Sequence, residues 1–345
     1  MKLGIIGHGM VADTHVKAIA ASDQDLEVSG VLGRSRARAA AYTSRIEADL
    51  GYRPRVYQSI EDLCADTTLD FALLLTPPDA RMSYVEALTS ASLPILMEKP
   101  VERSFEAAKA IVEMGETHNL PFGVVFQHRA REASRALAKH LAQGTLGDIA
   151  TVDIRVPWWR AQSYYDAPGR GTYARDGGGV LINQAIHTLD LALCFLGPVQ
   201  SVQALLATTP LHDMQAEDFA AGLLTFQSGA VGTLSASTAA FPGHPESIAL
   251  HGTKGAAHLA SGVLDISLHD SRKITHGQKS STGGGADPMA FTHAWHKSLI
   301  EDFALSLQEQ RAPMAPAREA LRAHALIHAL EKAAQTQTKV AVTNV

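Results

Sequence analysis

The first twelve residues place a glycine-rich turn directly between an apolar strand and a helix. Residues 3–6 form an apolar run, Gly7-His8-Gly9-Met10-Val11-Ala12 follows it, and residues 10–21 have helical periodicity. In such a turn the first glycine permits a tight bend, the second lets a ligand approach the backbone, and a small third residue lets helix and strand pack closely. The N–H groups at the helix N-terminus then face an anion. The pattern predicts a dinucleotide-binding turn formed by Gly7, Gly9, Met10, Val11 and Ala12; the alternative is a glycine-rich turn that binds nothing.

Strands and helices alternate throughout the first third of the chain. Strands are expected at residues 26–32, 55–57, 71–75, 94–97 and 122–126, with helices at 36–50, 80–90 and 105–118. The run at 71–75 is apolar throughout, which is typical of a strand buried on both faces of a parallel sheet. We therefore expect an N-terminal doubly wound parallel sheet over residues 1–125.

After a helix at 131–143 the alternation gives way to strands joined by turns. Runs at 150–158, 199–207, 220–226, 230–237, 247–251, 256–260 and 263–268 indicate an open, mostly antiparallel sheet, with helices at 181–196 and 316–336. Residues 271–287 are rich in Gly, Ser and Thr and are expected to form a flexible loop. The fold class is thus α/β, with a C-terminal α+β domain over residues 126–345. A partner subunit is the expected cover for the open face of its sheet.

Composition restricts the partners of this 345-residue chain. Lys and Arg total 30 and Asp and Glu 35, a net charge of −5, which disfavours nucleic acid because polyanion binding needs many basic contacts. No run reaches the roughly 20 apolar residues of a membrane helix. The apolar start is too short for a signal peptide, two cysteines lack CxxC spacing, and the 16 histidines show no HExxH pattern. We expect a cytoplasmic protein that binds no metal.

The end of the second predicted strand indicates which nicotinamide cofactor fits. An acidic residue there would hold the ribose hydroxyls of NAD, whereas arginine accepts the 2′-phosphate of NADP. The sequence reads Gly33-Arg34-Ser35-Arg36-Ala37-Arg38. Glu27 lies at the opposite end of the strand, about 20 Å away at 3.3 Å per residue. We therefore expect NADP, held by Arg34, Ser35 and Arg38; a solvated basic turn that tolerates NAD is the alternative.

A lysine follows a later strand of the same sheet. Glu98-Lys99-Pro100 stands at the carboxyl end of that strand, where open α/β sheets bind their ligands. Lys99 is suited to orient and polarise a substrate hydroxyl. The alternative is an exposed loop lysine that pairs with Glu98.

A histidine follows the triplet Gly177-Gly178-Gly179. On a helix, Asn183 and His187 are four residues apart and share one face, and Asp190 is placed to orient the imidazole. A histidine with a near-neutral pKa suits removal of the proton from an alcohol. The alternative is a histidine of the apolar core.

Together these motifs resemble the Gfo/Idh/MocA oxidoreductases, the family of glucose–fructose oxidoreductase and inositol dehydrogenase, over essentially the whole chain. The resemblance rests on the opening turn, Thr76-Pro77-Pro78, Glu98-Lys99-Pro100, the turn at 144–147 and the segment from the glycine triplet to Asp190. It implies a Rossmann domain, and a sheet domain that forms homodimer or homotetramer contacts.

The resemblance also implies roles for individual residues. Lys99 would contact both cofactor and substrate, with a cis peptide bond before its proline, and His187 would be the acid/base group. Thr76, Pro77 and Glu98 would lie on the cofactor side. Two positions depart from the family pattern: Asn183 replaces a common aspartate, which leaves His187 more of the acid/base task, and Arg81 replaces a common histidine.

Aromatic and polar residues elsewhere are candidates for contacts with the substrate and the nicotinamide. Trp158-Trp159-Arg160 and Tyr164-Tyr165 suit stacking on a sugar ring and hydrogen bonds to its hydroxyls, with Arg160 and Tyr165 favoured; a packed rim is the alternative. Gln127 and Arg129 follow the last strand of the first sheet and could border the nicotinamide. His293 and His296 indicate a helix face rather than a metal site.

The sequence as a whole predicts an NAD(P)-dependent dehydrogenase or reductase acting on a secondary alcohol or ketone of a sugar, cyclitol or sugar derivative. Hydride would pass between the carbinol carbon and the nicotinamide, with Lys99, His187 and Asn183 as the catalytic groups. Two alternatives stay open: a dehydrogenase of a non-sugar cyclic diol, and a non-catalytic sensor that binds NADP.

Overall fold

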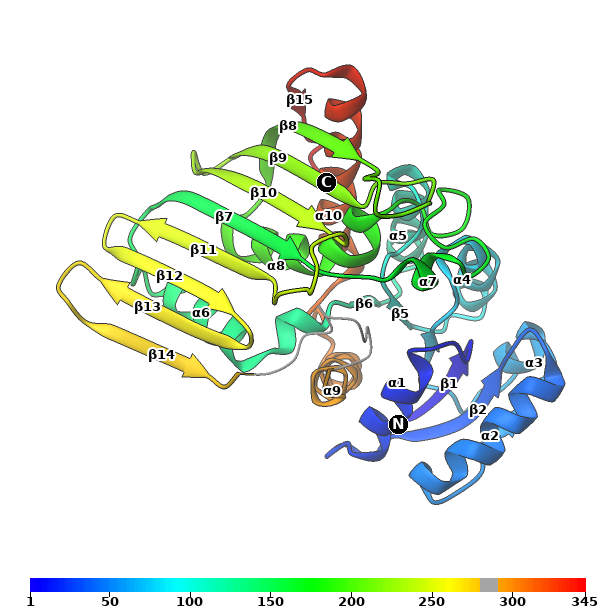
Figure 1. Cartoon of the computed structure of the whole chain (residues 1–345). Helices are drawn as coiled ribbons and strands as arrows, with labels where there is room; N and C mark the ends of the chain where they lie inside the picture. The colour runs from blue at the N-terminus through cyan, green and yellow to red at the C-terminus, as the bar shows by residue number, and fades with distance from the viewer. Residues whose placement is uncertain (280–290) are drawn as a thin grey trace. The chain divides into compact units, whose positions relative to one another are not determined.

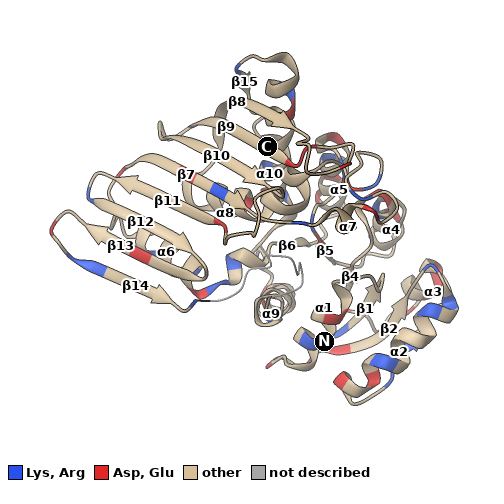
Figure 2. Ribbon diagram, in the orientation of Figure 1, with Lys and Arg blue, Asp and Glu red and all other residues tan. Residues whose placement is uncertain are grey.

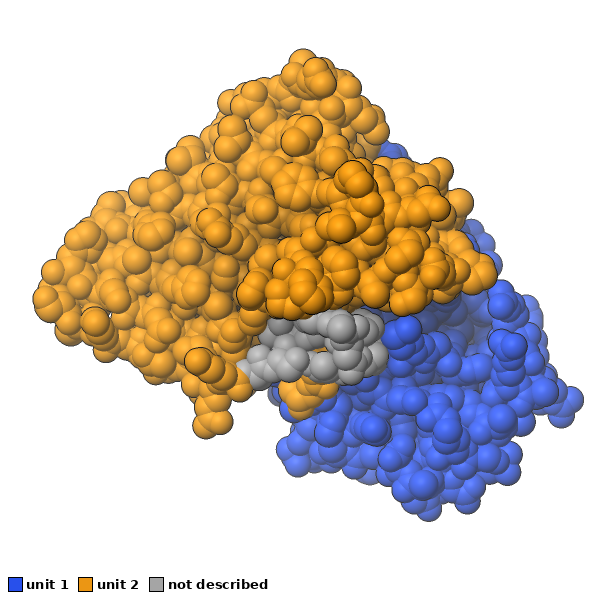
Figure 3. Space-filling view, viewed as in Figure 1, with its two compact units in different colours: residues 1–102, 106–127, 293–320 blue, residues 103–105, 128–292, 321–345 orange. Residues whose placement is uncertain are grey.

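The computed structural model describes residues 1–279 and 291–345. These residues form two compact units (Figure 3). Unit 1 consists of residues 1–102, 106–127 and 293–320, and unit 2 of residues 103–105, 128–292 and 321–345. The chain therefore returns to unit 1 at residues 293–320, a segment that the sequence-based division assigned to the second domain.

Unit 1 contains a six-stranded parallel sheet with the strand order β3-β2-β1-β4-β5-β6 (Figure 1). Its strands are β1 (Lys2–Ile6), β2 (Glu27–Leu32), β3 (Arg55–Val56), β4 (Phe71–Leu74), β5 (Ile95–Glu98) and β6 (Phe122–Val125). The strands β4, β5 and β6 are buried along their whole length, as expected of strands covered on both faces. The order reverses between β1 and β4, which creates the switch point where such sheets bind ligands. The predicted doubly wound sheet is confirmed.

Helices connect these strands, and one later helix joins them. They are α1 (Ala12–Ala20), α2 (Arg36–Leu50), α3 (Ile60–Cys64), α4 (Arg81–Ser90) with a preceding 3-10 turn (Pro78–Ala80), α5 (Phe105–Thr117) and α9 (Ala294–Glu309). The ring of Phe303 in α9 lies 5.4 Å from that of Phe71 in β4. It also covers Gly123 of β6, where any Cβ would lie 2.8 Å from it. This packing explains why α9 belongs to unit 1.

Unit 2 contains a nine-stranded sheet in the order β14-β13-β12-β11-β7-β10-β9-β8-β15. The strands are β7 (Ile149–Pro157), β8 (Val199–Ala207), β9 (Phe219–Phe226), β10 (Val231–Ser237), β11 (Ser247–Gly252), β12 (Gly255–Ala260), β13 (Val263–Leu268), β14 (Lys273–Gly277) and β15 (Val340–Ala341). Among these described strands only β7 and β10 pair in parallel, so the predicted mostly antiparallel sheet is confirmed.

Helices cover one face of this sheet (Figure 1). The helices that lie wholly or mostly in unit 2 are α6 (Glu132–Ala142), α7 (Gln162–Tyr165), α8 (Ile186–Leu196) and α10 (Ala317–Thr336). A 3-10 turn at Gln127–Ala130 begins at the boundary between the units, and a π turn at Leu181–Ala185 precedes α8. The side chain of Leu330 in α10 lies against Gly222 of β9, and α8 packs on β7 and β11. Alternate residues of the strands therefore point into a core, and the others point to the opposite face.

Two sequence-based expectations need correction. The flexible loop expected at 271–287 is wrong for Lys273–Gly277, which pairs with β13 as an edge strand. An edge strand needs only one hydrogen-bonded neighbour, so its sequence can stay polar. Residues 280–287 of that loop lie outside the described residues. The single helix expected at 181–196 begins as a π turn, and α8 proper starts at Ile186.

Among residues 1–279 and 291–345, no helix has the length and apolar character required to cross a bilayer.

Candidate active site

The glycine-rich turn after β1 has open space where a ligand's phosphates would approach. Gly7 has φ +94°, and a Cβ there would lie 3.1 Å from the backbone nitrogen of Thr76, so only glycine fits. A Cβ at Gly9 would meet nothing within 4 Å. Ala12 is fully buried at the start of α1, while Met10 is 58% exposed. These residues fit a pyrophosphate at the helix N-terminus.

The turn between β2 and α2 presents a basic surface. Ser35 is the N-cap of α2, and its Oγ accepts a hydrogen bond from the backbone N–H of Arg38 at 3.4 Å. Arg34, Arg36 and Arg38 are exposed, and the basic residues of α2 are blue in Figure 2. Ser35 therefore already has a structural task as a helix cap, beside its predicted contact with a phosphate.

Glu98, at the end of β5, is a buried carboxylate held by two histidines. Its Oε1 lies 2.8 Å from Nε2 of His15 in α1 and 3.9 Å from Nε2 of His296 in α9. Its Oε2 accepts the backbone N–H of Lys99 at 3.2 Å. Burial would raise the pKa of Glu98, but the His15 hydrogen bond and the nearby positive charges lower it to about 2. Glu98 is therefore ionised at neutral pH and fixes the backbone at Lys99.

Sequence reasoning placed His296 on a helix face and missed its approach to Glu98. Burial lowers the pKa of His296 to about 3, and the neighbouring His15 adds to this effect. His296 is therefore neutral at pH 7 and packs edge-on against the His15 ring at 4.9 Å. A contact between residues so far apart in the chain has no local sequence signal.

The buried guanidinium of Arg81 joins the carboxyl ends of β4 and β5. It donates to the carbonyl of Thr76 at 2.9 and 3.2 Å, to that of Val101 at 3.3 Å, and to those of Glu98 and Pro100. Burial lowers its pKa to about 10, which leaves it charged at pH 7. No sequence pattern predicts this role for Arg81. The peptide bond between Lys99 and Pro100 is cis, as the resemblance implied.

In unit 2, His187 lies at the start of α8 and is 5% exposed. Its ring stacks on that of His128 with centroids 4.9 Å apart. Nε2 of His128 lies 3.8 Å from Oε1 of Glu246. The Glu246 carboxylate also accepts hydrogen bonds from Arg131 at 2.6 Å and from the indole N–H of Trp158 at 3.1 Å. The acid/base candidate is thus supported by a second imidazole and a buried ionic group.

Asp190 forms a bidentate ion pair with Arg129. The carboxylate accepts from Nε of Arg129 at 2.8 Å and from Nη2 at 2.7 Å. Both residues are buried, so this pair fixes α8 to the turn at Gln127–Ala130. The sequence pattern predicts that Asp190 orients His187 and that Arg129 borders the nicotinamide. Gln127, at the start of the same turn, is also buried.

Asn183 lies in the π turn, and its amide holds the glycine triplet. Its Nδ2 donates to the carbonyls of Gly178 at 2.8 Å and Gly179 at 3.1 Å. The carboxylate of Glu217 accepts the backbone N–H groups of Gly179 at 3.1 Å and Leu181 at 3.0 Å. A buried carboxylate of the chain itself therefore occupies the N-terminal end of this turn. Nothing in the local sequence pointed to Glu217.

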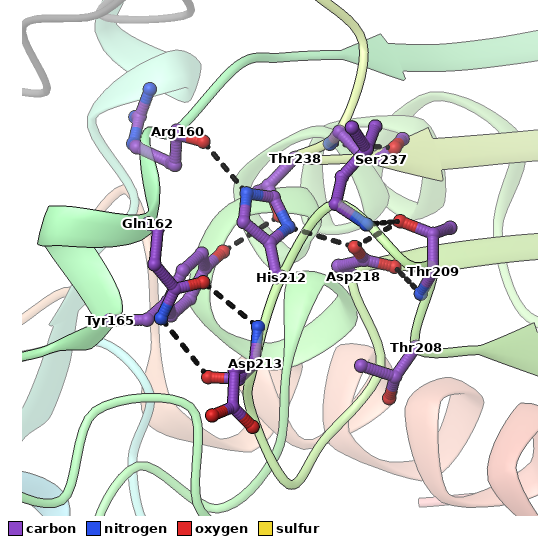
Figure 4. Close-up of polar contacts among 12 residues, drawn as sticks. Arg160, Gln162, Tyr165, Thr208, Thr209, His212, Asp213, Asp218, Ser237 and Thr238 are labelled. Atoms are coloured by element: carbon purple, nitrogen blue, oxygen red, sulfur yellow. Dashed lines mark hydrogen bonds and ion pairs between the residues drawn. The ribbon is translucent and has the colours of Figure 1, made fainter.

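Arg160 and Tyr165, the substrate candidates, are largely buried and belong to a polar network shown in Figure 4. The imidazole of His212 contacts the carbonyl of Arg160 at 2.8 Å through Nε2 and Oδ2 of Asp218 at 2.8 Å through Nδ1. The hydroxyl of Tyr165 lies 2.7 Å from Oγ1 of Thr238. Neither His212 nor Asp218 belongs to a motif, so no sequence signal points to them.

The arginine side chain packs on aromatic rings. Its guanidinium lies 5.3 Å from the ring centre of Trp158 and 5.7 Å from that of Tyr164, and it donates to the carbonyl of Trp159 at 2.7 Å. Arg160 is 3% exposed. The packed rim, which was the alternative interpretation of this segment, thus describes much of its environment.

The predicted site residues gather in separate places within each unit. Unit 1 groups the glycine turn, the Arg34–Arg38 turn, Thr76 and Lys99 at the carboxyl ends of its parallel strands. Unit 2 groups His187, His128 and Glu246 in one cluster, and Arg160, Tyr165 and His212 in another.

Comparison with known proteins identifies the family. Residues 1–126 match the oxidoreductase family with an NAD-binding Rossmann fold, and residues 134–258 match the GFO/IDH/MocA C-terminal domain. These matches cover more than half of the chain, and the chain belongs to the Gfo/Idh/MocA family of oxidoreductases. The resemblance drawn from the sequence is confirmed.

Several relatives are named sugar or cyclitol dehydrogenases. The chain is 25% identical over 260 residues to inositol 2-dehydrogenase of Rhizobium meliloti (strain 1021), covering 74% of each protein. It is 28% identical over 267 residues to D-apiose dehydrogenase of Rhizobium rhizogenes, covering 74% of this chain and 72% of the relative.

Solved structures share the fold along the whole chain. The WlbA dehydrogenase of Bordetella pertussis, in complex with NADH and UDP-GlcNAcA, is 27% identical with a TM-score of 0.81, covering 100% of this chain and 99% of that one. Levoglucosan dehydrogenase, at 19% identity and a TM-score of 0.84 over 100% of both chains, shares the fold.

Proposed function

We propose that this oxidoreductase interconverts a secondary alcohol and a ketone on a sugar, cyclitol or sugar derivative, with NADP as the preferred cofactor. The substrate class is supported by the named activities of relatives that align with most of the chain. The observation that carries the reaction is Lys99, a lysine at the carboxyl end of a central parallel strand whose backbone is fixed by the buried Glu98.

The nicotinamide, when bound, supplies the hydride chemistry. The residues of the chain supply binding, orientation and proton transfer. His187 takes the proton of the substrate hydroxyl at a nitrogen of its imidazole, which can act as a general base. The ammonium of Lys99 stabilises the negative charge that develops on the same oxygen. His128 keeps the His187 ring in one orientation through the stack, and Asn183 hydrogen-bonds substrate beside it.

Substitution of Lys99 tests the reaction. Lys99→Met should lower kcat by about 10³-fold, within the usual range for loss of a group that acts on the reacting proton or charge. Lys99→Arg keeps the charge and should recover part of the rate. Cofactor affinity, measured by quenching of protein fluorescence, should change much less than kcat. An unchanged kcat in Lys99→Met would remove Lys99 from the mechanism.

A second variant tests the proton-transfer role. His187→Gln keeps a polar side chain of similar size but has no basic nitrogen, so kcat should fall by about 10²-fold or more. The acid limb of the kcat/KM profile should disappear with it. A retained acid limb would assign that titration to another group.

The cofactor preference rests on the absence of an acidic residue at the end of β2. Arg34 and Arg38 are exposed beside Ser35 at the N-terminus of α2, a setting that suits a phosphate. The test is a panel of polyols, sugars and non-sugar cyclic diols, run with NAD and NADP side by side and followed by reduced-nicotinamide absorbance. A clear preference for NAD would refute the assignment of Arg34, Ser35 and Arg38. Tight NADP binding without turnover of any substrate would favour a sensor.

We also propose that the open face of the unit 2 sheet pairs with a second copy of the chain. Leu205, Leu223 and Val231 point to the face opposite the helices and are 62%, 57% and 49% exposed. Strands β8, β9 and β10 carry no charged residue (Figure 2). Such an apolar, uncharged sheet surface is typical of a subunit interface.

Leu223→Asp tests this contact. A charge in the middle of an apolar interface would be desolvated without a partner, so the variant should elute as a monomer when size-exclusion chromatography is combined with light scattering. The matched control Gln143→Asp places the same charge at the exposed end of α6, on the helix-covered side of the sheet, and should leave the oligomer intact. A wild-type protein that is itself monomeric would refute the proposal.

A further inference from the structure

The imidazole of His8 occupies the space that a side chain at position 33 would need. His8 is the middle residue of Gly7-His8-Gly9, and Gly33 directly follows β2. A Cβ at position 33 would lie 2.5 Å from Nε2 of His8 and 2.7 Å from its Cδ2. Both distances are far below van der Waals contact, so no residue but glycine fits while the ring is there.

Position 33 is the place where a Rossmann fold that binds NAD carries its acidic ribose clamp, at the carboxyl end of the second strand. In this chain the acidic residue is therefore not merely missing from the sequence. The His8 ring excludes it, and a nitrogen of the imidazole points to the site where the carboxylate would stand. One residue thus changes both the shape and the chemistry of the adenosine-ribose site.

The ring rests on a fixed support. It stacks on Tyr42 of α2, with centroids 5.2 Å apart and planes inclined by 23°. Tyr42 is 5% exposed, and the guanidinium of Arg45 lies 4.9 Å from its ring centre. Arg45 in turn makes two hydrogen bonds, of 2.8 and 2.7 Å, to Asp13 of α1. The Tyr42 ring that supports the imidazole is therefore itself packed against an ion pair that joins α2 to α1.

We propose that His8 is a specificity-determining residue that reads the 2′ substituent of the adenosine ribose. The proposal rests on the nicotinamide cofactor of the proposed function and deepens its choice of NADP. A neutral imidazole can exchange one hydrogen bond with a ribose hydroxyl. An imidazolium makes a charge-assisted hydrogen bond to a 2′-phosphate, which is about twice as strong as a neutral one.

The charged groups around His8 favour binding of a 2′-phosphate over a ribose hydroxyl. On the β2–α2 turn, Arg34, Arg36 and Arg38 provide only positive charge. On the helix side, the carboxylate of Asp13 is committed to Arg45, which leaves Tyr42 as the group in ring contact. Burial raises the pKa of the Tyr42 hydroxyl, so that this group stays neutral. A phosphate is thus the anion that the imidazolium would meet.

The test compares dissociation constants for NADP, NAD and 2′,5′-ADP, measured by isothermal titration calorimetry at pH 6.0 and 8.5. His8→Phe keeps a ring that stacks on Tyr42 and loses both nitrogens. At pH 6.0 it should bind NADP and 2′,5′-ADP about tenfold more weakly than wild type, with little change for NAD. The same comparison is made at pH 8.5, and the ratio of the wild-type and variant dissociation constants at each pH cancels the titration of the phosphate itself.

A double variant tests the exclusion of the acid. Gly33→Asp alone should lower the melting temperature, because its Cβ meets His8. His8→Ala with Gly33→Asp should recover that loss and shift selectivity toward NAD by at least tenfold. The exposed Lys2→Gln, at the amino end of β1 and so at the opposite edge of the sheet, is the control for lost positive charge and should change no dissociation constant by more than about twofold.

The outcomes separate this proposal from the proposed function. If wild type prefers NAD, the NADP assignment fails, but the NADP-to-NAD selectivity of His8→Phe still tests His8. The same selectivity in His8→Phe and wild type at both pH values overturns the role of His8, whichever cofactor is preferred. An intact melting temperature in Gly33→Asp overturns the steric exclusion.

Discussion

Two glycine-rich turns among the residues that the structure describes each lead into a helix, and they use glycine for opposite reasons. In unit 1, a Cβ at Gly9 would meet no atom within 4 Å. In unit 2, a Cβ at Gly179 would lie 1.8 Å from the carbonyl oxygen of Glu217. The first turn leaves space for something outside the protein, and the second is filled by the protein itself.

The helix N-termini behind the two turns differ in the same way. The N-terminal end of any helix attracts an anion, because its first N–H groups have no partner within the helix. In unit 2 the Glu217 carboxylate satisfies the N–H groups of Gly179 and Leu181. In unit 1 the turn that leads into α1 has open space at Gly9, where a Cβ would meet no protein atom within 4 Å. We infer that the first turn is a ligand site and that the second is a device for positioning α8 and His187.

The largest effect is expected from Gly179→Ala. The new methyl group would meet backbone atoms of Glu217, which cannot rotate away as a side chain can. We expect the free energy of unfolding to fall by about 3 kcal/mol or more, or the variant not to fold at all. Urea denaturation followed by circular dichroism measures this. A variant of wild-type stability would show that the second turn is not packed as described.

Asn183→Asp should have the next largest effect. The amide of Asn183 donates to the carbonyls of Gly178 and Gly179, and a carboxylate would turn an acceptor toward both. The expected loss is about 2 kcal/mol in the free energy of unfolding at pH 8. Asn183→Ala, which removes the donor without adding an acceptor, is the control and should lose less. Equal losses would show that repulsion from the carbonyls plays no part.

Gly9→Ala should leave stability unchanged and weaken cofactor binding. The methyl group has free space in the protein, so the melting temperature should stay within about 2 °C of wild type, because even 1 kcal/mol moves it only a few degrees. The bound pyrophosphate would lose its close approach to the backbone, and the dissociation constant should rise at least tenfold, about 1.4 kcal/mol. Calorimetric titration with the cofactor checks it. Undiminished binding would remove the contrast between the two turns.

The sequence predicted those parts of the fold that depend on local pattern. The apolar runs of β4, β5 and β6, the glycine spacing of the first turn and the alternation in the large sheet all lie within short windows. The edge strand β14 was missed because its residues are polar, and α9 could not be assigned to unit 1 because its packing on Phe71 joins distant segments. Local periodicity carries no information about such contacts.

The residues of the candidate site also divide into those with a local sequence pattern and those without one. Lys99, His187 and the glycine turn stand in motifs, so their residue types and spacing were sufficient to predict them as site residues. The groups that support them come from elsewhere in the chain: His15 is 83 residues from Glu98, and Glu217 is 38 residues from Gly179. A supporting residue needs only the right atom at the right place, so its position in the sequence is unconstrained.

Glu217→Gln gives the smallest effect and the most direct test of whether the second turn stabilises an anion. Burial raises the pKa of the Glu217 carboxyl above 4.5, and the N–H groups of Leu181 and Gly179 only partly offset this. A raised pKa means that the contribution of this group to stability is complete below pH 4.5 and is lost as the pH rises through the folded-state value. The free energy of unfolding of wild type minus that of Glu217→Gln should therefore be largest below pH 4.5. Above it, the difference should fall by at most about 1.4 kcal/mol per pH unit, as urea denaturation at several pH values would measure. A difference that grows with pH would mean that the turn stabilises the carboxylate as a helix N-terminus stabilises a phosphate, and the two turns would then be alike.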